Sequence, residues 1–300
     1  MIRTLGTLFA GLLGLAFGSF LNVCLSRWPA GESITRPRSH CRACGRTLPW
    51  WENIPVASWI ALRGHCRTCG ASISARYPLV EAAVGILWAI DTWKYSFAFQ
   101  YLDLTLWSLP WIVVCFLGPF TFSWLLVALS ALDAEYRWLP DRLTFPGIAM
   151  GIQVGAVDKY FFKGSILTPV SLENFFLSSY MRNFWLDRLL AILAAALLIL
   201  AIRWIYWLIR RREGIGLGDA KLMALLAAWL GLPGALLAFF LGVILGALTA
   251  LALLALPTQK EGTWAATRLP LGTFLCIGGI VSSLWGQPIL NAYLTWAGFR

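Results

Sequence analysis

The segment LTLWSLPWIVVCFLGPFTFSWLLVALSAL, residues 104–132, decides the fold because it contains no charged residue. It is longer than the roughly 20 apolar residues that an α-helix needs to cross a lipid bilayer. A carboxylate, Asp133, follows it directly. A charge at the end of a membrane-spanning helix is costly unless it faces water or a partner, so Asp133 is a candidate functional residue.

The rest of the chain is equally apolar. Of its 300 residues, 59% are hydrophobic and 13% are charged, and the mean hydropathy is +0.72. These values exclude a soluble globular protein and predict an all-α polytopic membrane protein. The net charge of +10 lies mostly in short loops beside apolar runs. That placement favours a topology signal and contact with anionic membrane lipids over a nucleic-acid partner.

The apolar runs predict about eight transmembrane helices, the sixth and seventh separated by the turn Gly231-Leu-Pro-Gly234. They lie near residues 5–25, 79–97, 108–133, 143–157, 187–209, 220–232, 234–256 and 269–287. The first helix is expected to be retained rather than cleaved as a signal peptide. The arginine-rich loop that follows it predicts a cytoplasmic segment and an N-terminus outside. Three parts are expected: a first transmembrane helix at 1–26, a cytoplasmic domain at 27–78 and a multi-helix transmembrane domain at 79–300.

The cytoplasmic segment contains two CxxC pairs, Cys41/Cys44 and Cys66/Cys69. Four thiolates at this spacing can surround a structural Zn²⁺, and so short a segment has little core of its own. The pattern therefore predicts a small zinc-ribbon-like domain, with disulfides or redox chemistry as alternatives. His40 and His65 precede cysteines and are interpreted as bystanders. The single cysteines 24, 115 and 276 are expected to be buried as small hydrophobic residues.

A second carboxylate, Asp219, ends the stretch Gly214-Ile-Gly-Leu-Gly-Asp219 and precedes another apolar run. A P-loop is excluded, because the Lys-Ser/Thr pair and the preceding strand are missing. A plain helix start with Asp219 as its N-cap is the alternative. If Asp133 and Asp219 meet, they repel and share one proton, so that one can activate water while the other hydrogen-bonds a scissile carbonyl. No metal is expected at these aspartates, since histidine ligands are lacking there. Asp141, after Pro140, is expected to be the N-cap of the next helix.

Several motifs together resemble type IV prepilin peptidases, which are bifunctional intramembrane aspartyl proteases. Asp133 with Leu139-Pro140-Asp141, and Gly214-x-Gly-x-Gly-Asp219-Ala-Lys221-Leu222, are similar to the two signature regions of that family. The likeness covers almost the whole chain. Its other parts are the first-helix motif at 18–23, the two-CxxC loop ending at 76–81, and Pro270-Leu-Gly-Thr-Phe-Leu275. The family usually has Pro-Phe-Gly-Pro-Phe in the last motif, and Leu271 and Thr273 depart from it.

The resemblance implies that Asp133 and Asp219 are the catalytic pair. It implies prepilin and pseudopilin precursors as substrates, cut at the cytoplasmic face of the bacterial inner membrane after a short basic leader. It also implies methylation of the new N-terminus with S-adenosylmethionine. Gly64 matches a glycine associated with methyl transfer, whereas His65 stands where a lysine is often found. The alternatives are a peptidase without methyltransferase activity, and a zinc-ribbon membrane scaffold of a pilus or secretion assembly without catalysis.

Overall fold

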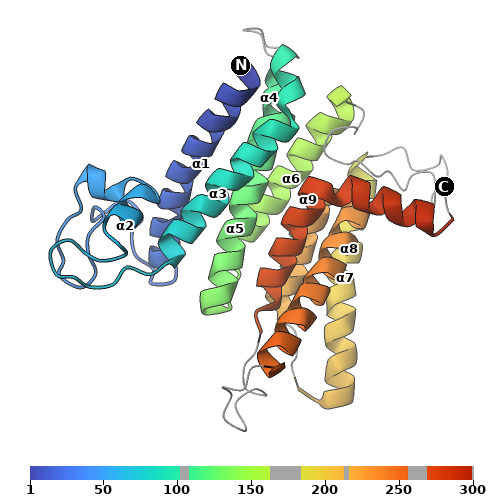
Figure 1. Ribbon diagram of the computed structural model, residues 1–300. Helices are drawn as coiled ribbons and strands as arrows, with labels where there is room; N and C mark the ends of the chain where they lie inside the picture. Colours follow the sequence, from blue (N-terminus) through green and yellow to red (C-terminus); the bar gives the residue numbers. More distant parts are fainter. Residues whose placement is uncertain (102–107, 163–183, 213–215, 256–268, 299–300) are drawn as a thin grey trace. The chain divides into compact units, whose positions relative to one another are not determined.

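The computed structural model describes residues 1–101, 108–162, 184–212, 216–255 and 269–298 (Figure 1). Within these ranges the secondary structure consists of helices and two isolated β-bridges, which confirms the all-α prediction. The chain divides into two compact units, Met1–Ala131 and Leu132–Arg300. The three-part division expected at 1–26, 27–78 and 79–300 stays a prediction.

Among the residues that the structure describes, five helical segments are long and apolar enough to cross a membrane. They are Ile2–Arg27, Leu109–Tyr136, Phe184–Arg210, Leu217–Leu253 and Leu271–Trp296. The helices expected at 79–97 and 143–157 are present as α3 (Arg76–Lys94) and α6 (Asp141–Phe162). The chain therefore has the long apolar helices of a polytopic membrane protein, while the total of about eight spans stays a prediction.

In the first unit, α1 (Ile2–Arg27) lies along α3 (Figure 1). Gly14 and Gly18, one turn apart, let the two backbones approach closely. A Cβ atom on Gly14 would lie 2.9 Å from the Cα of Gly85, and one on Gly18 would lie 2.7 Å from the Cα of Glu81. Small residues at such spacing are typical of helix pairs that pack in membranes, where lipid gives apolar side chains little reason to associate.

The remaining elements of the first unit are short helices and the start of α5. The loop after α1 carries η1 (Trp50–Asn53) and α2 (Ala57–Ala61), and η2 (Ser96–Tyr101) follows α3. A one-turn α4 (Leu109–Ile112) and the π-helical turn η4 (Val113–Leu117) lead into α5 (Gly118–Tyr136). The indole of Trp88 donates to the carbonyl of Phe120 at 3.0 Å. This bond fastens α3 to the start of α5.

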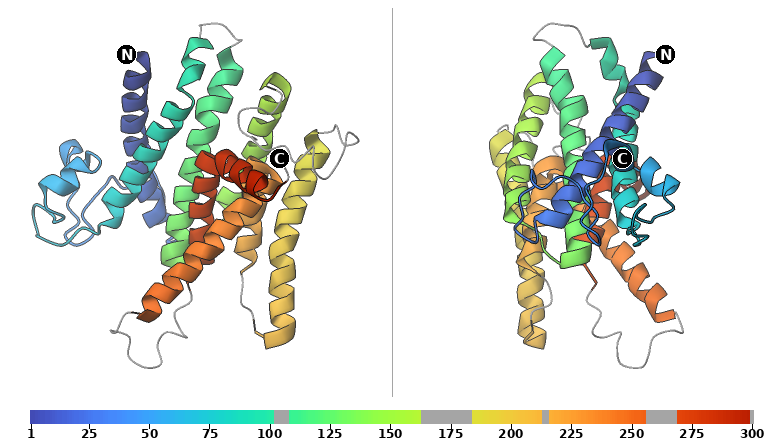
Figure 2. Two further views of the ribbon diagram at one scale, coloured as in Figure 1. Left: turned by 45° about the vertical axis from the view of Figure 1, so that its right-hand side comes forward. Right: turned by 90° about the vertical axis from the view of Figure 1, so that its left-hand side faces the viewer.

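In the second unit, α8 (Leu217–Ala255) packs against both α7 (Phe184–Arg210) and α9 (Leu271–Trp296) (Figure 2). The helical course of α8 is interrupted at Gly231, whose φ of 71° and ψ of 176° are open to glycine and strained for other residues. The sequence predicted two spans, 220–232 and 234–256, separated by a turn. The structure agrees with a turn at this place: Gly231 separates two helical segments, and the second runs back toward the end at which α8 begins, since Asp219 and Gly246 both lie beside the first turns of α9 (Figure 2).

A buried arginine lies beside this kink. Arg188 on α7 donates to the carbonyl of Ala227 on α8 at 3.4 Å and interacts electrostatically with Asp158 on α6. Both charged side chains are buried, Asp158 completely. A buried charge is tolerated when it is paired and hydrogen-bonded. The pair thus joins α6, α7 and α8 and holds the broken helix in place.

Candidate active site and metal centre

Asp133 lies in the last turn of α5, on the part of that helix that belongs to the second unit. The helix ends just beyond it, where Arg137 adopts a positive φ of 51° and donates its N–H to the carbonyl of Asp133. The Asp133 side chain is buried, with 7% of its residue surface exposed. Its Oδ2 atom accepts the Thr273 N–H at 2.7 Å and the Thr273 hydroxyl at 3.2 Å.

These two donors belong to the first turn of α9. The residue that precedes this helix is Pro270, which makes no side-chain cap. The first N–H groups of a helix have no partner within the helix and must find one elsewhere. Asp133 supplies that partner from α5, so one carboxylate both caps α9 and has its position fixed by it. Gly272 makes the approach possible, because a Cβ there would lie 2.9 Å from the Asp133 carboxyl carbon.

Asp219 is positioned by its own helix. It is the third residue of α8, and its Oδ2 accepts the N–H of Gly216 at 3.2 Å. A side chain at the third position that reaches back to the N-cap N–H is half of a capping box. The alternative in which Asp219 is itself the N-cap is therefore wrong, because the helix begins two residues earlier. Gly214 of the glycine motif lies outside the described residues.

The structure brings the two carboxylates into one site. Asp133 and Asp219 are close enough to repel each other electrostatically, and both act on the thiol of Cys276, one turn along α9 from Thr273. Cys276 is completely buried, as expected for a small hydrophobic residue. Asp219 is also buried, with 9% of its surface exposed. Three helix ends, of α5, α8 and α9, thus meet around two acids.

Asp141 has a different role from the one expected. It is the first residue of α6 rather than the cap before it, and its Oδ1 lies 2.5 Å from the ammonium of Lys221 on α8. Lys221 stands two residues after Asp219. The ion pair therefore ties the start of α6 to the start of α8, next to the helix turn that carries Asp219.

Sequence reasoning missed the long-range partners of the two carboxylates. The sequence interpretation gives no role to Thr273 or Lys221. A signal is present at 273, since threonine departs from the proline of the resembled motif and offers both an N–H and a hydroxyl. The partner of that N–H could not be read from the sequence, because Asp133 is 140 residues away.

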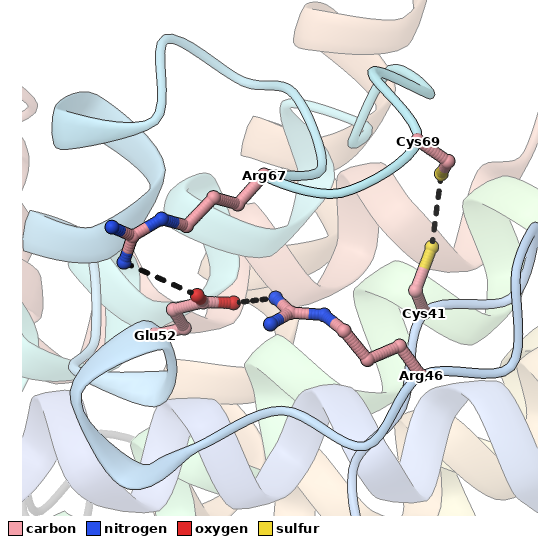
Figure 3. Close-up of polar contacts among 5 residues, drawn as sticks. All are labelled: Cys41, Arg46, Glu52, Arg67 and Cys69. Carbon is pink, nitrogen blue, oxygen red and sulfur yellow. Dashed lines mark hydrogen bonds and ion pairs between the residues drawn. The ribbon is translucent and has the colours of Figure 1, made fainter.

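The four paired cysteines converge in the first unit. The sulfurs of Cys41, Cys44, Cys66 and Cys69 all lie within 4.8 Å of one another, and those of Cys41 and Cys69 are 3.8 Å apart (Figure 3). Two sulfurs of a tetrahedral zinc site, each about 2.3 Å from the metal, are about 3.8 Å apart. A disulfide would need about 2.05 Å. The residues therefore fit a tetrahedral metal ion, and this sulfur–sulfur distance does not fit a disulfide.

Each cysteine pair forms the same tight turn. The N–H of Gly45 bonds the carbonyl of Cys41, and the N–H of Gly70 bonds the carbonyl of Cys66; both glycines have a φ near +70°. His40 and His65 each bond a backbone carbonyl two residues earlier through Nδ1. Neither histidine belongs to the sulfur cluster, in agreement with their interpretation as bystanders.

Backbone N–H groups in these turns point at sulfur. Those of Cys69 and Thr68 lower the pKa of the Cys66 thiol to about 6, and those of Cys44 and Ala43 lower the pKa of Cys41. The N–H of Ala71 favours the Cys69 thiolate as well, but the neighbouring cysteines outweigh it and raise the pKa of Cys69 to about 11. Four adjacent thiolates repel one another unless a cation lies between them.

Glu52 joins the two turns (Figure 3). Its buried carboxylate forms an ion pair with Arg46, just after the first cysteine pair, and another at 3.8 Å with Arg67, between the second pair. One acid that neutralises an arginine from each turn fixes their relative placement. This contact lies in η1, and nothing in the sequence singled out Glu52.

Gly64 lies in the same loop and has a packing role. Its φ is +70°, and a Cβ there would lie 2.9 Å from the indole ring of Trp59. The indole is itself fixed by a bond of 3.0 Å from Nε1 to the carbonyl of Ile73. Glu81 on α3 fastens the loop from the other side, since its carboxylate accepts the Val56 N–H at 2.7 Å. Any side chain at Gly64 would displace Trp59.

Comparison with known proteins gives a consistent result. Residues 12–95 match the model of the bacterial peptidase A24 N-terminal domain, and residues 120–251 match that of the type IV leader peptidase family. A protein of Stutzerimonas stutzeri is 32% identical over 97% of this chain and 94% of its own length. One of Xanthomonas campestris is 33% identical over 99% of this chain and 97% of its own length. Both relatives are named prepilin leader peptidase/N-methyltransferase. No solved structure matches the chain significantly.

Proposed function

Because this chain belongs to the type IV leader peptidase family, we propose that it is a membrane-embedded aspartyl endopeptidase that removes the short basic leader of type IV prepilins and pseudopilins and then methylates the new N-terminus. Asp133 and Asp219 are the catalytic pair. One observation carries this assignment: the end of α5 and the start of α8 place two buried carboxylates within electrostatic range of each other.

The two carboxylates share the work of hydrolysis. The ionised one takes a proton from a water molecule, whose oxygen forms a bond to the scissile carbonyl carbon. The protonated one donates a hydrogen bond to the carbonyl oxygen, which gains negative charge as that bond forms. The leaving amine then takes the proton that the first carboxylate gained from water, as the carbon–nitrogen bond breaks. No covalent enzyme intermediate forms, and no metal is needed at this pair.

The four cysteines hold a structural Zn²⁺. Support comes from the sulfur spacing, which fits a tetrahedral tetrathiolate ion. The ion would link the two turns that Glu52 also joins, and so give the loop between α1 and α3 a fixed shape without a hydrophobic core. Its contribution is to stability, and hydrolysis takes place at the two aspartates.

Methylation uses S-adenosylmethionine as the methyl donor. The relatives' name supports this activity, and Gly64, which the resemblance links to methyl transfer, lies against the indole of Trp59. Methyl transfer assays on cleaved substrate distinguish this function from a peptidase without methyltransferase activity.

The protein lies in the bacterial inner membrane as a multi-pass protein, with its N-terminus outside. The loop with the four cysteines lies in the cytoplasm. The two catalytic aspartates lie at the cytoplasmic edge of the membrane. Arginines of residues 27–78 support this orientation. The apolar N-terminal helix expected of a pilin precursor would lie in lipid beside the enzyme, with its basic leader near the two acids.

The decisive experiment incubates purified protein in detergent with a synthetic prepilin, with and without S-adenosylmethionine, and measures product masses. We expect removal of the leader and addition of one methyl group. Asp133→Asn and Asp219→Asn should each lower cleavage by orders of magnitude while the protein stays folded. Glu135→Gln, an exposed acid of the same helix end, is the matched control. Cleavage at the control's rate by either Asn variant would point to a scaffold without catalysis.

A further inference from the structure

Thr273 makes the closest described contact to a member of the acidic pair. Its N–H and its hydroxyl both donate to Oδ2 of Asp133, at 2.7 and 3.2 Å. The N–H is one of the donors at the start of α9 that have no acceptor within the helix, and the positive end of a helix dipole favours an anion there. A carboxylate that accepts several hydrogen bonds is stabilised in its ionised form. Thr273 therefore favours Asp133 as the ionised member of the pair.

The ionised form of Asp219 is stabilised by fewer hydrogen bonds. Its described hydrogen bond comes from the N–H of Gly216, at 3.2 Å. It also lies in the first turn of a helix, so the dipole of α8 acts on it as that of α9 acts on Asp133. The two acids thus differ in the donors that the first turn of α9 offers to Asp133, two of which belong to Thr273, with the Gly272 N–H as a further one. When two carboxylates share one proton, it resides on the acid that is less well hydrogen-bonded as an anion.

The other titratable and charged groups around Asp133 come from three helices. Asp219 faces it from α8, Cys276 from α9, and Arg137 from the end of its own helix. Asp133 and Asp219 repel each other when both are ionised, whereas Arg137 favours the ionised form of Asp133. The Arg137 side chain is exposed, so solvent screens its effect more than it screens the contact with Thr273.

Proline at position 273 would offer Asp133 neither an N–H nor a hydroxyl. A helix tolerates proline in its first turn, so the exchange of threonine for proline leaves α9 able to form.

We propose that Thr273 is a positioning residue that holds Asp133 in the ionised, water-activating state, and so leaves the shared proton on Asp219 to bond the scissile carbonyl. This inference rests on the proposed function. Its consequence is that the chain keeps its ionised base to a lower pH than it would with proline at this position.

The test compares pH profiles of kcat/KM for prepilin cleavage by wild type, Thr273→Pro, Thr273→Val and Thr273→Ser. Thr273→Pro removes both donors and should move the acidic limb of the profile up by about one to two pH units. Thr273→Val keeps the N–H and the shape of threonine, so its acidic limb should move by a smaller amount in the same direction. Thr273→Ser keeps both donors and should restore the wild-type limb.

Two outcomes would overturn the inference. In one, Thr273→Pro has the acidic limb of the wild type. In the other, Thr273→Pro and Thr273→Val lose the same fraction of activity at every pH, as expected from a packing defect; thermal unfolding in detergent would register that defect separately. Failure of the wild type to cleave would instead refute the proposed function, so the two failures are distinguishable.

Discussion

Gly272 is the residue whose change should disturb the acidic pair most directly. In Gly272→Ala the added Cβ would lie 2.9 Å from both Cγ and Oδ2 of Asp133 and 3.3 Å from Oδ1. Carbon atoms in comfortable contact are about 3.5 to 4.0 Å apart, so the carboxyl group must retreat by about half an ångström or more. A carboxylate is the far end of a rotatable side chain, so the backbone need not move, and the weakened cap of α9 costs about 1 kcal/mol of stability.

The same displacement of the Asp133 carboxylate should lower the rate of cleavage strongly. Displacing a reacting group by about 1 Å can lower the rate about 100-fold. We therefore expect Gly272→Ala to lower kcat/KM for prepilin cleavage by about 10- to 100-fold, a loss of about 1.4 to 2.7 kcal/mol of transition-state stabilisation. Cleavage is followed by product mass at several substrate concentrations, and folding by the thermal midpoint in detergent.

A matched control is available in the same unit. In Gly246→Ala the new Cβ would lie 3.4 Å from the ring of Phe274, an ordinary contact. This variant makes the same chemical change in α8, on the side that faces α9, and should cleave like the wild type. The reasoning is refuted if Gly272→Ala cleaves within about threefold of that control at an equal thermal midpoint.

Three further predictions concern the cysteine loop. Freshly purified, reduced protein should contain about one zinc ion per chain, and a chelator should lower its thermal midpoint; metal analysis that finds no zinc would contradict this. Glu52→Gln should release bound zinc at lower chelator concentration than the wild type, because it removes the ion pairs that join the two turns, while exposed Glu32→Gln should not. Gly64→Ala should lower methylation of cleaved prepilin more than cleavage itself, because its Cβ displaces Trp59. Gly45→Ala shares the positive φ but meets no atom within 4 Å, so an equal effect of both changes would exclude the indole contact as the cause.

The sequence was most informative where the signal is local. An uncharged run longer than a bilayer is thick can satisfy its backbone only as a helix, so residues 104–132 predicted a spanning helix from their composition alone. Two CxxC pairs predicted a four-sulfur cluster, since each pair brings its own two ligands together within one turn. The glycine and proline at 231 and 233 predicted the interruption of α8 for the same reason, because backbone restrictions act at the residue itself.

The sequence by itself therefore determined the helical membrane architecture, the cysteine cluster and the identity of two candidate acids. The tertiary structure decided what surrounds those acids. It placed Thr273 and Gly272 against Asp133, paired Asp141 with Lys221, and used Glu52 to join the two cysteine turns. Hydropathy and spacing report on neighbours along the chain, whereas these contacts join residues that meet because whole helices and turns pack together. Their hydrogen bonds and close approaches depend on that packing, and they leave no periodic pattern in the sequence.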